Sequence, residues 1–243
     1  MKRLGVYLIN LDRSEDRLKA MRERLGRLGL EFVRVKGVDG RARGIDPKLA
    51  SERKFRLAHG KKRILPGEYG CYMSHVRALS EFIKSKNDLA LILEDDMKFD
   101  RDFARVVERL AAMPQWDMVK LNGSHHGGNI KKAAIDASHD LVINAFYQSK
   151  SGAYLVNRRA AKAYLDKMLP MFTPLDHEFI KFWKYGIRGY SVRPFPAAEE
   201  GGASTIEHPK NHGNILFRLS SVLYKAYTAV RRAVYAAGKS VGK

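Results

Sequence analysis

The chain has 243 residues and a formal net charge of +19, with 45% apolar and 10% aromatic residues. This composition excludes a wholly disordered chain, and the length is sufficient to bury a large core. The single cysteine, Cys71, excludes an internal disulfide, and no uncharged apolar stretch reaches the roughly 18 residues that a membrane-spanning helix needs.

The first 66 residues predict a β-α-β unit followed by a long loop. Leu4–Ile9 is an apolar run of strand length. Ser14 is a candidate N-cap for a helix whose apolar residues recur at helical spacing until Gly29. Residues 31–35 alternate as a second strand, which the usual handedness of such units makes parallel to the first. Residues 37–66, rich in glycine, lysine and arginine, are expected to form a long, partly ordered loop.

The remaining chain continues to alternate between helix and strand, which predicts an α/β fold. The most hydrophobic strand, at 89–93, is expected at the centre of the sheet. The other expected elements are helices at 68–85, 100–112 and 158–168, a helix opening at Pro174, strands at 118–121, 141–146, 153–156 and 190–195, and a polar loop at 123–132.

Charge is distributed unevenly along the chain. The net charge is +11 over residues 1–66, −2 over 67–149, +4 over 150–210 and +6 over 211–243. A basic surface favours anionic partners such as phosphates, nucleic acid or an anionic membrane, and the alternative is a solvated face without a specific partner. No signal-peptide-like apolar region opens the sequence, so we expect a cytosolic protein.

Residues 214–237 predict a basic amphipathic helix. Its apolar stripe is Leu219, Val222, Leu223, Ala226, Val230, Ala233 and Val234, with basic Arg218, Lys225 and Arg232 beside it and an aromatic column of Phe217, Tyr224 and Tyr235 further round. Basic residues with interfacial aromatics suit a helix that lies on an anionic membrane. The alternative is a helix whose stripe packs on the domain, and the two arrangements are compatible.

Three adjacent carboxylates follow the most hydrophobic strand. Glu94, Asp95 and Asp96 repel one another unless they share a cation, and hard oxygen ligands suit Mg²⁺ or Mn²⁺. In an α/β fold, ligands bind beyond the carboxyl ends of the strands. A metal ion held by Asp96, with Glu94 nearby, would bridge the phosphates of a nucleotide. The alternative is a solvated acidic turn.

Four segments together resemble glycosyltransferase family 25, the bacterial lipopolysaccharide and lipooligosaccharide glycosyltransferases. They are INLDRSEDR at 9–17, GEYGCYMSH at 67–75, LILEDD at 91–96 and SGAYLV at 151–156, and the resemblance covers residues 3–207. It implies a GT-A-like fold over residues 1–210, with residues 211–243 as a basic amphipathic C-terminal helix. It also implies transfer of a hexose, commonly galactose, from a UDP-sugar with inversion, and assigns the acidic run to the DxD element of such folds.

On this interpretation, donor-binding residues come from several motifs. Asn10 would contact the base or ribose, and Arg13 and Arg17, four apart on the first helix, would bind diphosphate or stack on uracil. For Arg17 the alternative is a salt bridge with Asp12 or Asp16. The other donor-binding candidates are Ser74, His75, Glu94, Asp95, Lys120 and Asn122. His75 could equally be a satisfied, half-buried histidine, and Cys71 is expected to be a packing residue.

Inversion in one displacement requires a general base for the acceptor hydroxyl. Asp176 matches the position of a family acid, and Glu178 follows closely, so either could be the base. For Asp176 the alternative is a helix N-cap. The metal candidates are Asp96, Glu94 and His208, and the last is suggested by the late histidine that many GT-A enzymes use as a metal ligand.

The leading hypothesis is therefore a metal-assisted, UDP-sugar-dependent glycosyltransferase. We expect it to act on a lipid-linked glycan at the inner face of a bacterial inner membrane. A basic nucleic-acid-binding protein is a rival that the high net charge suggests, but the acidic cluster would repel phosphates, so no nucleic acid partner is expected. A metal-dependent nuclease would lack the acids for a two-metal site. A second rival is a catalytically silent relative that acts as a scaffold.

Overall fold

A computed structural model describes residues 2–60, 63–124, 127–201 and 215–241. Its strands are β1 (Leu4–Asn10), β2 (Val33–Lys36), β3 (Leu89–Glu94), β4 (Met97–Phe99), β5 (Met118–Lys120), β6 (Asn129–Ala134), β7 (Asp140–Asn144), β8 (Ala153–Asn157), β9 (Gly189–Arg193) and β10 (Ala197–Glu199). Its helices are α1 (Glu15–Arg27), α2 (Gly40–Arg43), α3 (Glu52–His59), α4 (Pro66–Lys84), α5 (Phe103–Ala112), α6 (Arg158–Lys167), α7 (Leu175–Phe179), α8 (Phe182–Tyr185) and α9 (Ile215–Val241).

Eight strands form one mixed sheet in the order β2-β1-β3-β8-β5-β9-β7-β6, and β4 pairs with β10 in a small separate sheet. The opening β-α-β unit is parallel as expected, and β1 also pairs with β3 in parallel. The sheet is not wholly parallel, because β8 runs antiparallel to β3 and β5, and β7 runs antiparallel to β9. The predicted central strand lies between β1 and β8, where both of its faces are covered.

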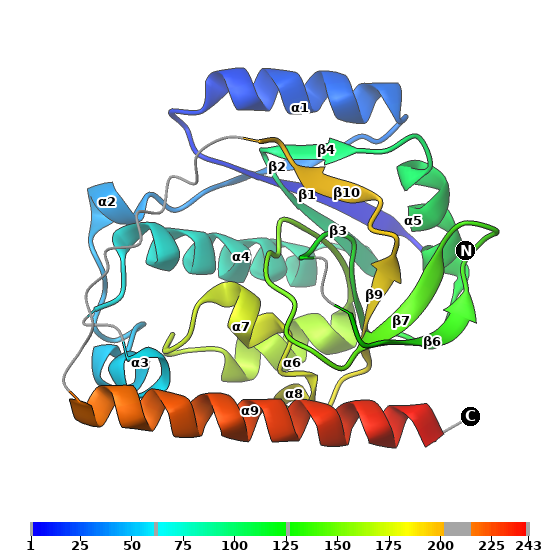
Figure 1. Ribbon diagram of the computed structural model, residues 1–243. Helices are drawn as coiled ribbons and strands as arrows, with labels where there is room; N and C mark the ends of the chain where they lie inside the picture. Colours follow the sequence, from blue (N-terminus) through cyan, green and yellow to red (C-terminus); the bar gives the residue numbers. More distant parts are fainter. Residues whose placement is uncertain (1, 61–62, 125–126, 202–214, 242–243) are drawn as a thin grey trace.

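Helices cover both faces of the sheet and enclose two apolar cores (Figure 1). Along β3, Leu91 and Leu93 face the core shared with α1 and α5, whereas Ala90 and Ile92 face the core shared with α4, α6, α7 and α8. This alternation follows from the two-residue period of a strand. The fold is therefore a three-layer α/β arrangement of the GT-A-like type that the sequence predicted.

The segment 37–66 differs from the predicted loop because it contains the helices α2 and α3. Phe55 and Ala58 of α3 are buried, and α3 packs against α9, more than 150 residues further along the chain. A helix of this length depends on tertiary packing for its stability. The composition of this segment therefore predicts less secondary structure than the segment contains.

Residues 129–132 were expected in a polar loop but belong to β6. This strand lies at the edge of the sheet, and its pairing with β7 shifts register between Lys131 and Ala133. Edge strands carry charged residues and irregularities that prevent further pairing, so they lack the clear alternation by which a strand is recognised. The missed strand extends the sheet beyond β7.

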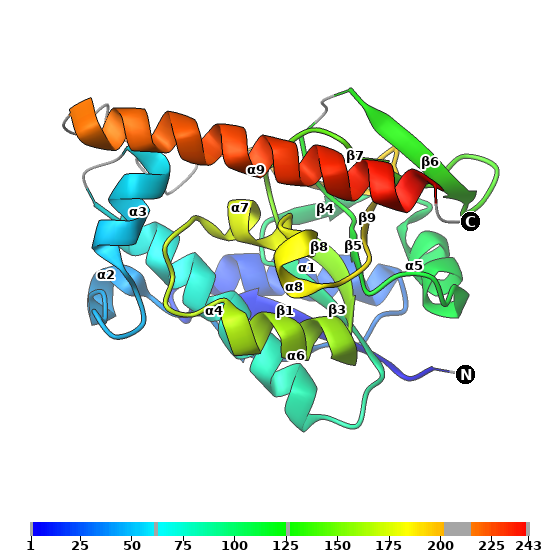
Figure 2. The same cartoon turned by 90° about the horizontal axis from the view of Figure 1, so that it is seen from below.

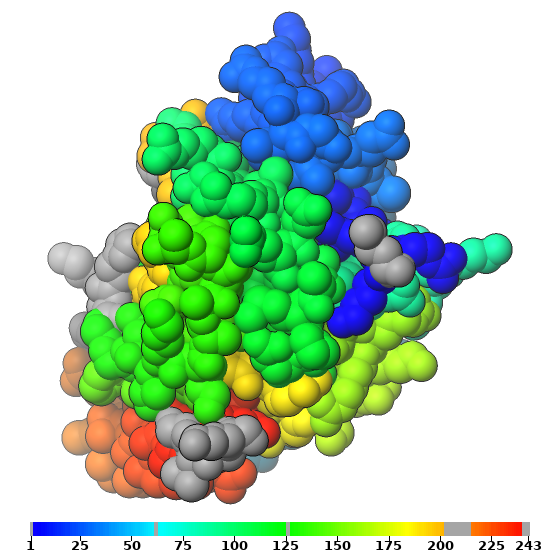
Figure 3. Space-filling view, turned by 90° about the vertical axis from the view of Figure 1, so that its right-hand side faces the viewer, coloured from blue at the N-terminus to red at the C-terminus, as the bar shows by residue number. Residues whose placement is uncertain are grey.

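Helix α9 lies along one edge of the molecule, where it packs on α3, α8, β6 and β7 (Figures 1 and 2). In Figure 3 its C-terminal half forms the lower border of the surface, beneath β6 and β7. The Tyr235 hydroxyl donates to the Ile187 carbonyl (3.1 Å) and accepts from the Gly189 N–H (2.9 Å), which attaches the helix to the start of β9. Among the described residues, no helix is long and apolar enough to cross a membrane.

Candidate active site

A cleft opens beyond the carboxyl ends of β1 and β3, where ligands bind in α/β folds. The parallel register places Ile9 opposite Glu94, so the segments that follow the two strands begin side by side. The cleft is also lined by the first half of α4 and by residues 38–41. Eight sequence-predicted residues line it: Asn10, Arg13, Arg17, Ser74, His75, Glu94, Asp95 and Asp96.

Asn10 connects the end of β1 to the acidic run. Its Nδ2 donates to Asp95 Oδ2 (2.7 Å) and to the Ser14 carbonyl (2.9 Å), while its Oδ1 accepts from Arg34 Nε (3.0 Å). The side chain is almost fully buried, so these bonds fix the Asp95 carboxylate at the wall of the cleft. Both amide atoms of Asn10 are thus bonded within the protein. Its contact with the base or ribose of a nucleotide stays a prediction.

Two arginines enter the cleft, each beside a carboxylate. Arg13 forms an ion pair with Asp39, while Arg17 lies 3.2 Å from Asp95 Oδ1 and 3.7 Å from Asp96 Oδ2. Arg13 precedes α1, which begins at Glu15, so the two arginines do not share a helix face as predicted. Arg17 pairs with the acidic run rather than with the neighbouring acids that the alternative interpretation named.

On the far wall of the cleft, the backbone of the first half of α4 lies close to the backbone of residues 38–40. The Ser74 Oγ donates to the Gly70 carbonyl (2.7 Å) and accepts from the Val38 N–H (2.8 Å), so this side chain joins α4 to the segment before α2. A Cβ atom on Gly70 would lie 2.5 Å from the Val38 oxygen, and one on Gly40 would lie 1.9 Å from the Pro66 oxygen. Glycine is therefore required where these two segments meet.

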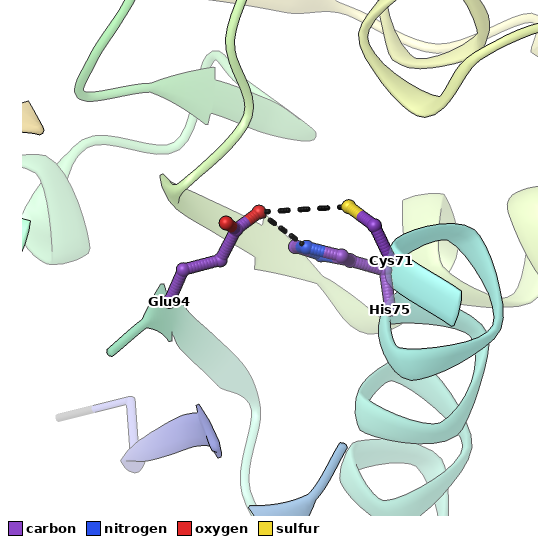
Figure 4. A group of neighbouring side chains, drawn as sticks. All are labelled: Cys71, His75 and Glu94. Atoms are coloured by element: carbon purple, nitrogen blue, oxygen red, sulfur yellow. Dashed lines mark hydrogen bonds and ion pairs between the residues drawn. The ribbon is translucent and has the colours of Figure 1, made fainter. Parts of the chain in front are cut away.

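His75 is fully buried and both of its ring nitrogens have partners, of which Figure 4 shows Glu94. Nε2 lies 3.0 Å from Glu94 Oε1, and Nδ1 lies 2.9 Å from the Tyr154 hydroxyl, whose ring stacks on the imidazole. Burial alone would raise the pKa of Glu94, but the hydrogen bond and charge of His75 outweigh it and lower that pKa. The satisfied-histidine alternative therefore describes His75 well, although the residue also lines the cleft.

Cys71 packs against the core as predicted, and it also belongs to this cluster. Its Sγ lies 3.8 Å from Glu94 Oε1, and the donor atoms of Cys71, His75 and Glu94 lie within 4.8 Å of one another. Burial and the charge of Glu94 raise the pKa of the thiol. The missed signal is the four-residue spacing of Cys71 and His75, which places both on one face of α4.

Asp96 has the features expected of a cation ligand. Burial and the neighbouring charges of Glu94 and Asp95 raise its pKa to about 6. Its Oδ1 atom is buried and has no hydrogen-bond partner within the described part of the chain. A hard divalent cation would satisfy this oxygen and remove the repulsion among the acids, so the residues fit the predicted metal. His208, the third predicted ligand, lies outside the described residues.

Lys120 ends β5 and Asn122 follows it, and neither residue lines the cleft. Lys120 is fully buried, its Nζ donates to the carbonyls of Gln148 (3.0 Å) and Ser149 (3.1 Å), and burial lowers its pKa to about 7. The Asn122 Oδ1 accepts from the Ala153 N–H (3.1 Å). Lys120 therefore holds the segment before β8, and Asn122 holds the first residue of β8. In the sheet, β8 separates β5 from β3.

The two candidate bases on α7 lie in different environments. Asp176 is half-buried and accepts hydrogen bonds from the Tyr147 hydroxyl and the His177 N–H. Asp176 lies within α7, whose N-cap position is occupied by Pro174, so the N-cap alternative is wrong. Its charge contributes to the raised pKa of the Cys71 thiol and opposes the lowering of the Lys120 pKa. Asp176 does not line the cleft.

Glu178 is buried within a saturated ion cluster. Its carboxylate accepts from Thr173 Oγ1 (2.6 Å), Lys181 Nζ (2.8 Å), Lys184 and Tyr185. Burial would raise its pKa, but the two lysines outweigh that effect and lower the pKa to about 2. Glu178 does not line the cleft, and its arrangement is that of a structural ion pair.

The mixed α/β sheet and the acidic cleft beyond β1 and β3 define a protein of the GT-A-like class. Residues 3–179 match the family model described as "Glycosyltransferase family 25 (LPS biosynthesis protein)". The chain belongs to glycosyltransferase family 25.

Curated relatives share this family. The chain is 26% identical to procollagen galactosyltransferase 1-B of Xenopus laevis, over 78% of this chain and 34% of that protein. It is 28% identical to a glycosyltransferase 25 family member of Aedes aegypti (70% and 29%) and 24% identical to human procollagen galactosyltransferase 2 (78% and 34%). The chain thus spans about a third of the length of these relatives.

Proposed function

We propose that this chain transfers a hexose from a UDP-sugar to a glycan acceptor, with inversion and with the assistance of Mn²⁺ or Mg²⁺. One observation carries the proposal: eight side chains chosen from three separate sequence motifs line a single cleft at the carboxyl ends of β1 and β3. The names of the vertebrate relatives, which are galactosyltransferases, support galactose as the hexose. A cleft that binds a diphosphate and a cation also explains why Arg13 and Arg17 lie beside the acidic run. Nucleic acid at this surface would be repelled by these acids.

The donor diphosphate would bind beside Arg13 and Arg17. Both guanidinium groups are held by carboxylates, so they are already oriented toward the cleft before the ligand arrives. When bound at Asp96, with Glu94 nearby, a divalent cation would neutralise the charge that develops on the leaving diphosphate. Asn10 keeps Asp95 against Arg17 and so preserves the charge balance of this wall.

Asp176 is the general base in this proposal, and Glu178 is not. The acceptor hydroxyl oxygen attacks the anomeric carbon, its proton passes to the Asp176 carboxylate, and the UDP leaving group takes the bonding electrons. The Tyr147 hydroxyl fixes the orientation of Asp176 by donating to it. Glu178 is a weak base because its pKa is about 2, and its oxygens are already bonded.

The acceptor proposed here is a lipid-linked glycan, such as that of a lipopolysaccharide or lipooligosaccharide, at the cytoplasmic face of a bacterial inner membrane. Support comes from α9, whose large apolar side chains face away from the domain. They are between 55% and 76% exposed: Ile215, Leu216, Leu219, Val222, Leu223, Tyr227, Val230 and Val234. Basic side chains lie beside this stripe, and residues 211–243 contain no acid, so the helix is complementary to an anionic surface.

Calorimetric titration of UDP, with and without Mn²⁺, tests the donor site. The wild type should bind UDP in a Mn²⁺-dependent manner, and Asp96→Ala should weaken this binding at least about tenfold, which is 1.4 kcal/mol. Asp166→Ala, an exposed acid on α6 away from the cleft, is the matched control and should bind as the wild type does.

Two outcomes would overturn parts of the proposal. Absence of UDP binding by the folded protein under any metal condition, together with salt-sensitive binding to nucleic acid, would replace the transferase with the nucleic-acid-binding rival. Binding of UDP-galactose without turnover on any glycan acceptor would favour the scaffold.

A further inference from the structure

The cluster of Cys71, His75 and Glu94 presents three different metal-binding groups to the donor cleft (Figure 4). Cys71 and His75 lie one turn apart on α4, and Glu94 approaches them from the end of β3. The Nε2–Oε1 distance is 3.0 Å and the Sγ–Oε1 distance is 3.8 Å. Two rigid elements thus bring a thiol, an imidazole and a carboxylate together at one point.

These distances are close to those of a tetrahedral zinc site. Zn–S bonds of about 2.3 Å and Zn–N and Zn–O bonds of about 2.0–2.2 Å place donor atoms roughly 3.3–3.7 Å apart at tetrahedral angles. The observed separations lie on either side of that range, so changes of a few tenths of an ångström would complete the geometry. Because all three residues line the cleft, a fourth position faces the solvent-filled space.

The donor set selects a cation different from the one proposed at Asp96. Mg²⁺ and Mn²⁺ prefer carboxylate and water oxygens, whereas a set with sulfur and nitrogen suits Zn²⁺. A thiolate and a carboxylate together also neutralise the dication. We propose that Cys71 Sγ, His75 Nε2 and Glu94 bind Zn²⁺ in a site that adjoins the hard-metal site and shares Glu94 with it.

Tyr154 supports this site from outside. Its buried hydroxyl lies 2.9 Å from His75 Nδ1, and its ring stacks on the imidazole, so the ring plane of His75 is fixed with Nε2 toward Glu94. A hydroxyl both donates and accepts, so it holds either imidazole tautomer. On zinc binding, the thiol proton and any proton on Nε2 leave to solvent, and the imidazole coordinates in its neutral form with its hydrogen on Nδ1. Such outer partners of a metal-bound histidine orient the ligand.

The zinc site has a consequence for the cleft that rests on the proposed function. A zinc ion bound through Glu94 would compete with the hard-metal site for this shared carboxylate and would occupy the wall where the donor would bind. We therefore expect Zn²⁺ to weaken Mn²⁺-dependent UDP binding in the wild type and not in Cys71→Ser. This makes the cluster an inhibitory site for zinc ions.

Cobalt substitution tests the zinc site without any nucleotide. Titration of the purified full chain with Co²⁺ should give one equivalent of binding, the visible bands of four-coordinate cobalt and a near-ultraviolet thiolate-to-cobalt band, all abolished by excess Zn²⁺. Because the chain contains a single cysteine, the thiolate band reports on Cys71 alone.

Three variants and one control identify the ligands. Cys71→Ser should lose the thiolate band, and Glu94→Gln should keep it but weaken zinc binding at least about tenfold. Tyr154→Phe should weaken zinc binding about tenfold, whereas Tyr164→Phe, a buried hydroxyl that bonds the Phe179 carbonyl, should leave it unchanged. Circular dichroism melting checks that each variant is folded.

Two results would overturn the proposal: a folded wild type that gives no thiolate band at any cobalt concentration, or Cys71→Ser that binds zinc as tightly as the wild type. Neither readout involves UDP. Failure of the zinc site is therefore distinguishable from failure of the proposed glycosyl transfer, which would appear as absent UDP binding with the cobalt spectrum intact.

Discussion

Two carboxylates on α7, two residues apart, show how partners determine what an acid can do. Glu178 faces Lys181 and Lys184, which stabilise its charge so strongly that it is a poor proton acceptor. Asp176 instead accepts a hydrogen bond from the Tyr147 hydroxyl and has no lysine partner among the bonds of the described residues. The sequence could not separate them, because both follow the same proline and differ only in what the fold places beside them.

Glu178→Gln should therefore reduce stability and leave donor binding intact. Removing one member of a buried ion cluster leaves Lys181 with an uncompensated charge, so we expect the free energy of unfolding to fall by about 3 kcal/mol. Urea unfolding measures the loss. Glu52→Gln is the control, because its exposed pair with Arg56 should contribute less than about 0.5 kcal/mol. A loss of UDP affinity in folded Glu178→Gln would contradict the structural role.

The ion pairs of Glu178 with Lys181 and Lys184 make the stability of the fold depend on pH, and the direction follows from the lowered pKa of Glu178. The pKa of Glu178 is about 2 in the folded protein, against an ordinary value of 4.5, so its ionisation stabilises the fold fully above pH 4.5. This contribution is lost as the pH falls toward 2. The difference in unfolding free energy between the wild type and Glu178→Gln should shrink between about pH 6 and about pH 3. A difference that stays constant over this interval would mean that Glu178 is not held ionised by its lysines.

At the scale of elements, the structure decides which face of α9 contacts the domain and which face is exposed. The sequence had left both arrangements open. The aromatic column was expected at a membrane interface, but Tyr235 bonds the start of β9 and Tyr224 lies half-buried beside His59. The large residues of the apolar stripe point to solvent instead, so the stripe does not pack on the domain as the alternative held. An exposed apolar face of this length, beside basic residues, is the feature that supports membrane docking.

Leu219→Glu should reduce binding of the chain to anionic vesicles. Losing one apolar contact and adding a negative charge should lower the affinity for phosphatidylglycerol-containing vesicles about tenfold or more. The matched control is Val33→Glu on β2, since Val33 is 58% exposed and Leu219 is 61% exposed. Sedimentation with vesicles measures both. Equal effects of the two substitutions, or equal binding of the wild type to zwitterionic vesicles, would argue against docking through α9.

At the scale of the whole molecule, the cleft depends on three segments that the sheet and α4 hold together. Residues 10–17, 70–75 and 94–96 meet because β1 and β3 are adjacent and α4 crosses one face of the sheet. The bonds between Asn10 and Asp95 and between His75 and Glu94 span these segments. A ligand in the cleft would therefore bind only the folded state.

UDP with Mn²⁺ should consequently stabilise the entire domain against unfolding. At a ligand concentration of about 100 times Kd, mass action predicts about 2.7 kcal/mol of added stability. Thermal unfolding of the wild type should shift upward with ligand concentration, and that of Asp96→Ala should shift less. An identical shift in both proteins would place the nucleotide away from Asp96.

Sequence alone was sufficient for the family, the alternating fold class, the interior position of the strand at 89–93 and eight of the residues that line the cleft. These follow from local hydrophobic patterns and from contiguous motifs such as LILEDD, in which neighbouring residues carry the signal. The acids at the end of that strand must lie at the carboxyl edge of the sheet, because the strand itself fixes their position.

Only the tertiary structure decided what depends on contacts between distant residues. In the fold, Cys71 lies beside Glu94, and Glu178 pairs with two lysines. Helix α3 packs against α9, and the apolar stripe of α9 is exposed. The tertiary structure also placed Lys120 beside the segment before β8, and Asn122 beside the first residue of β8, instead of in the cleft. Burial and charge pairing set the chemistry of each of these groups, and both arise between segments that are remote in sequence.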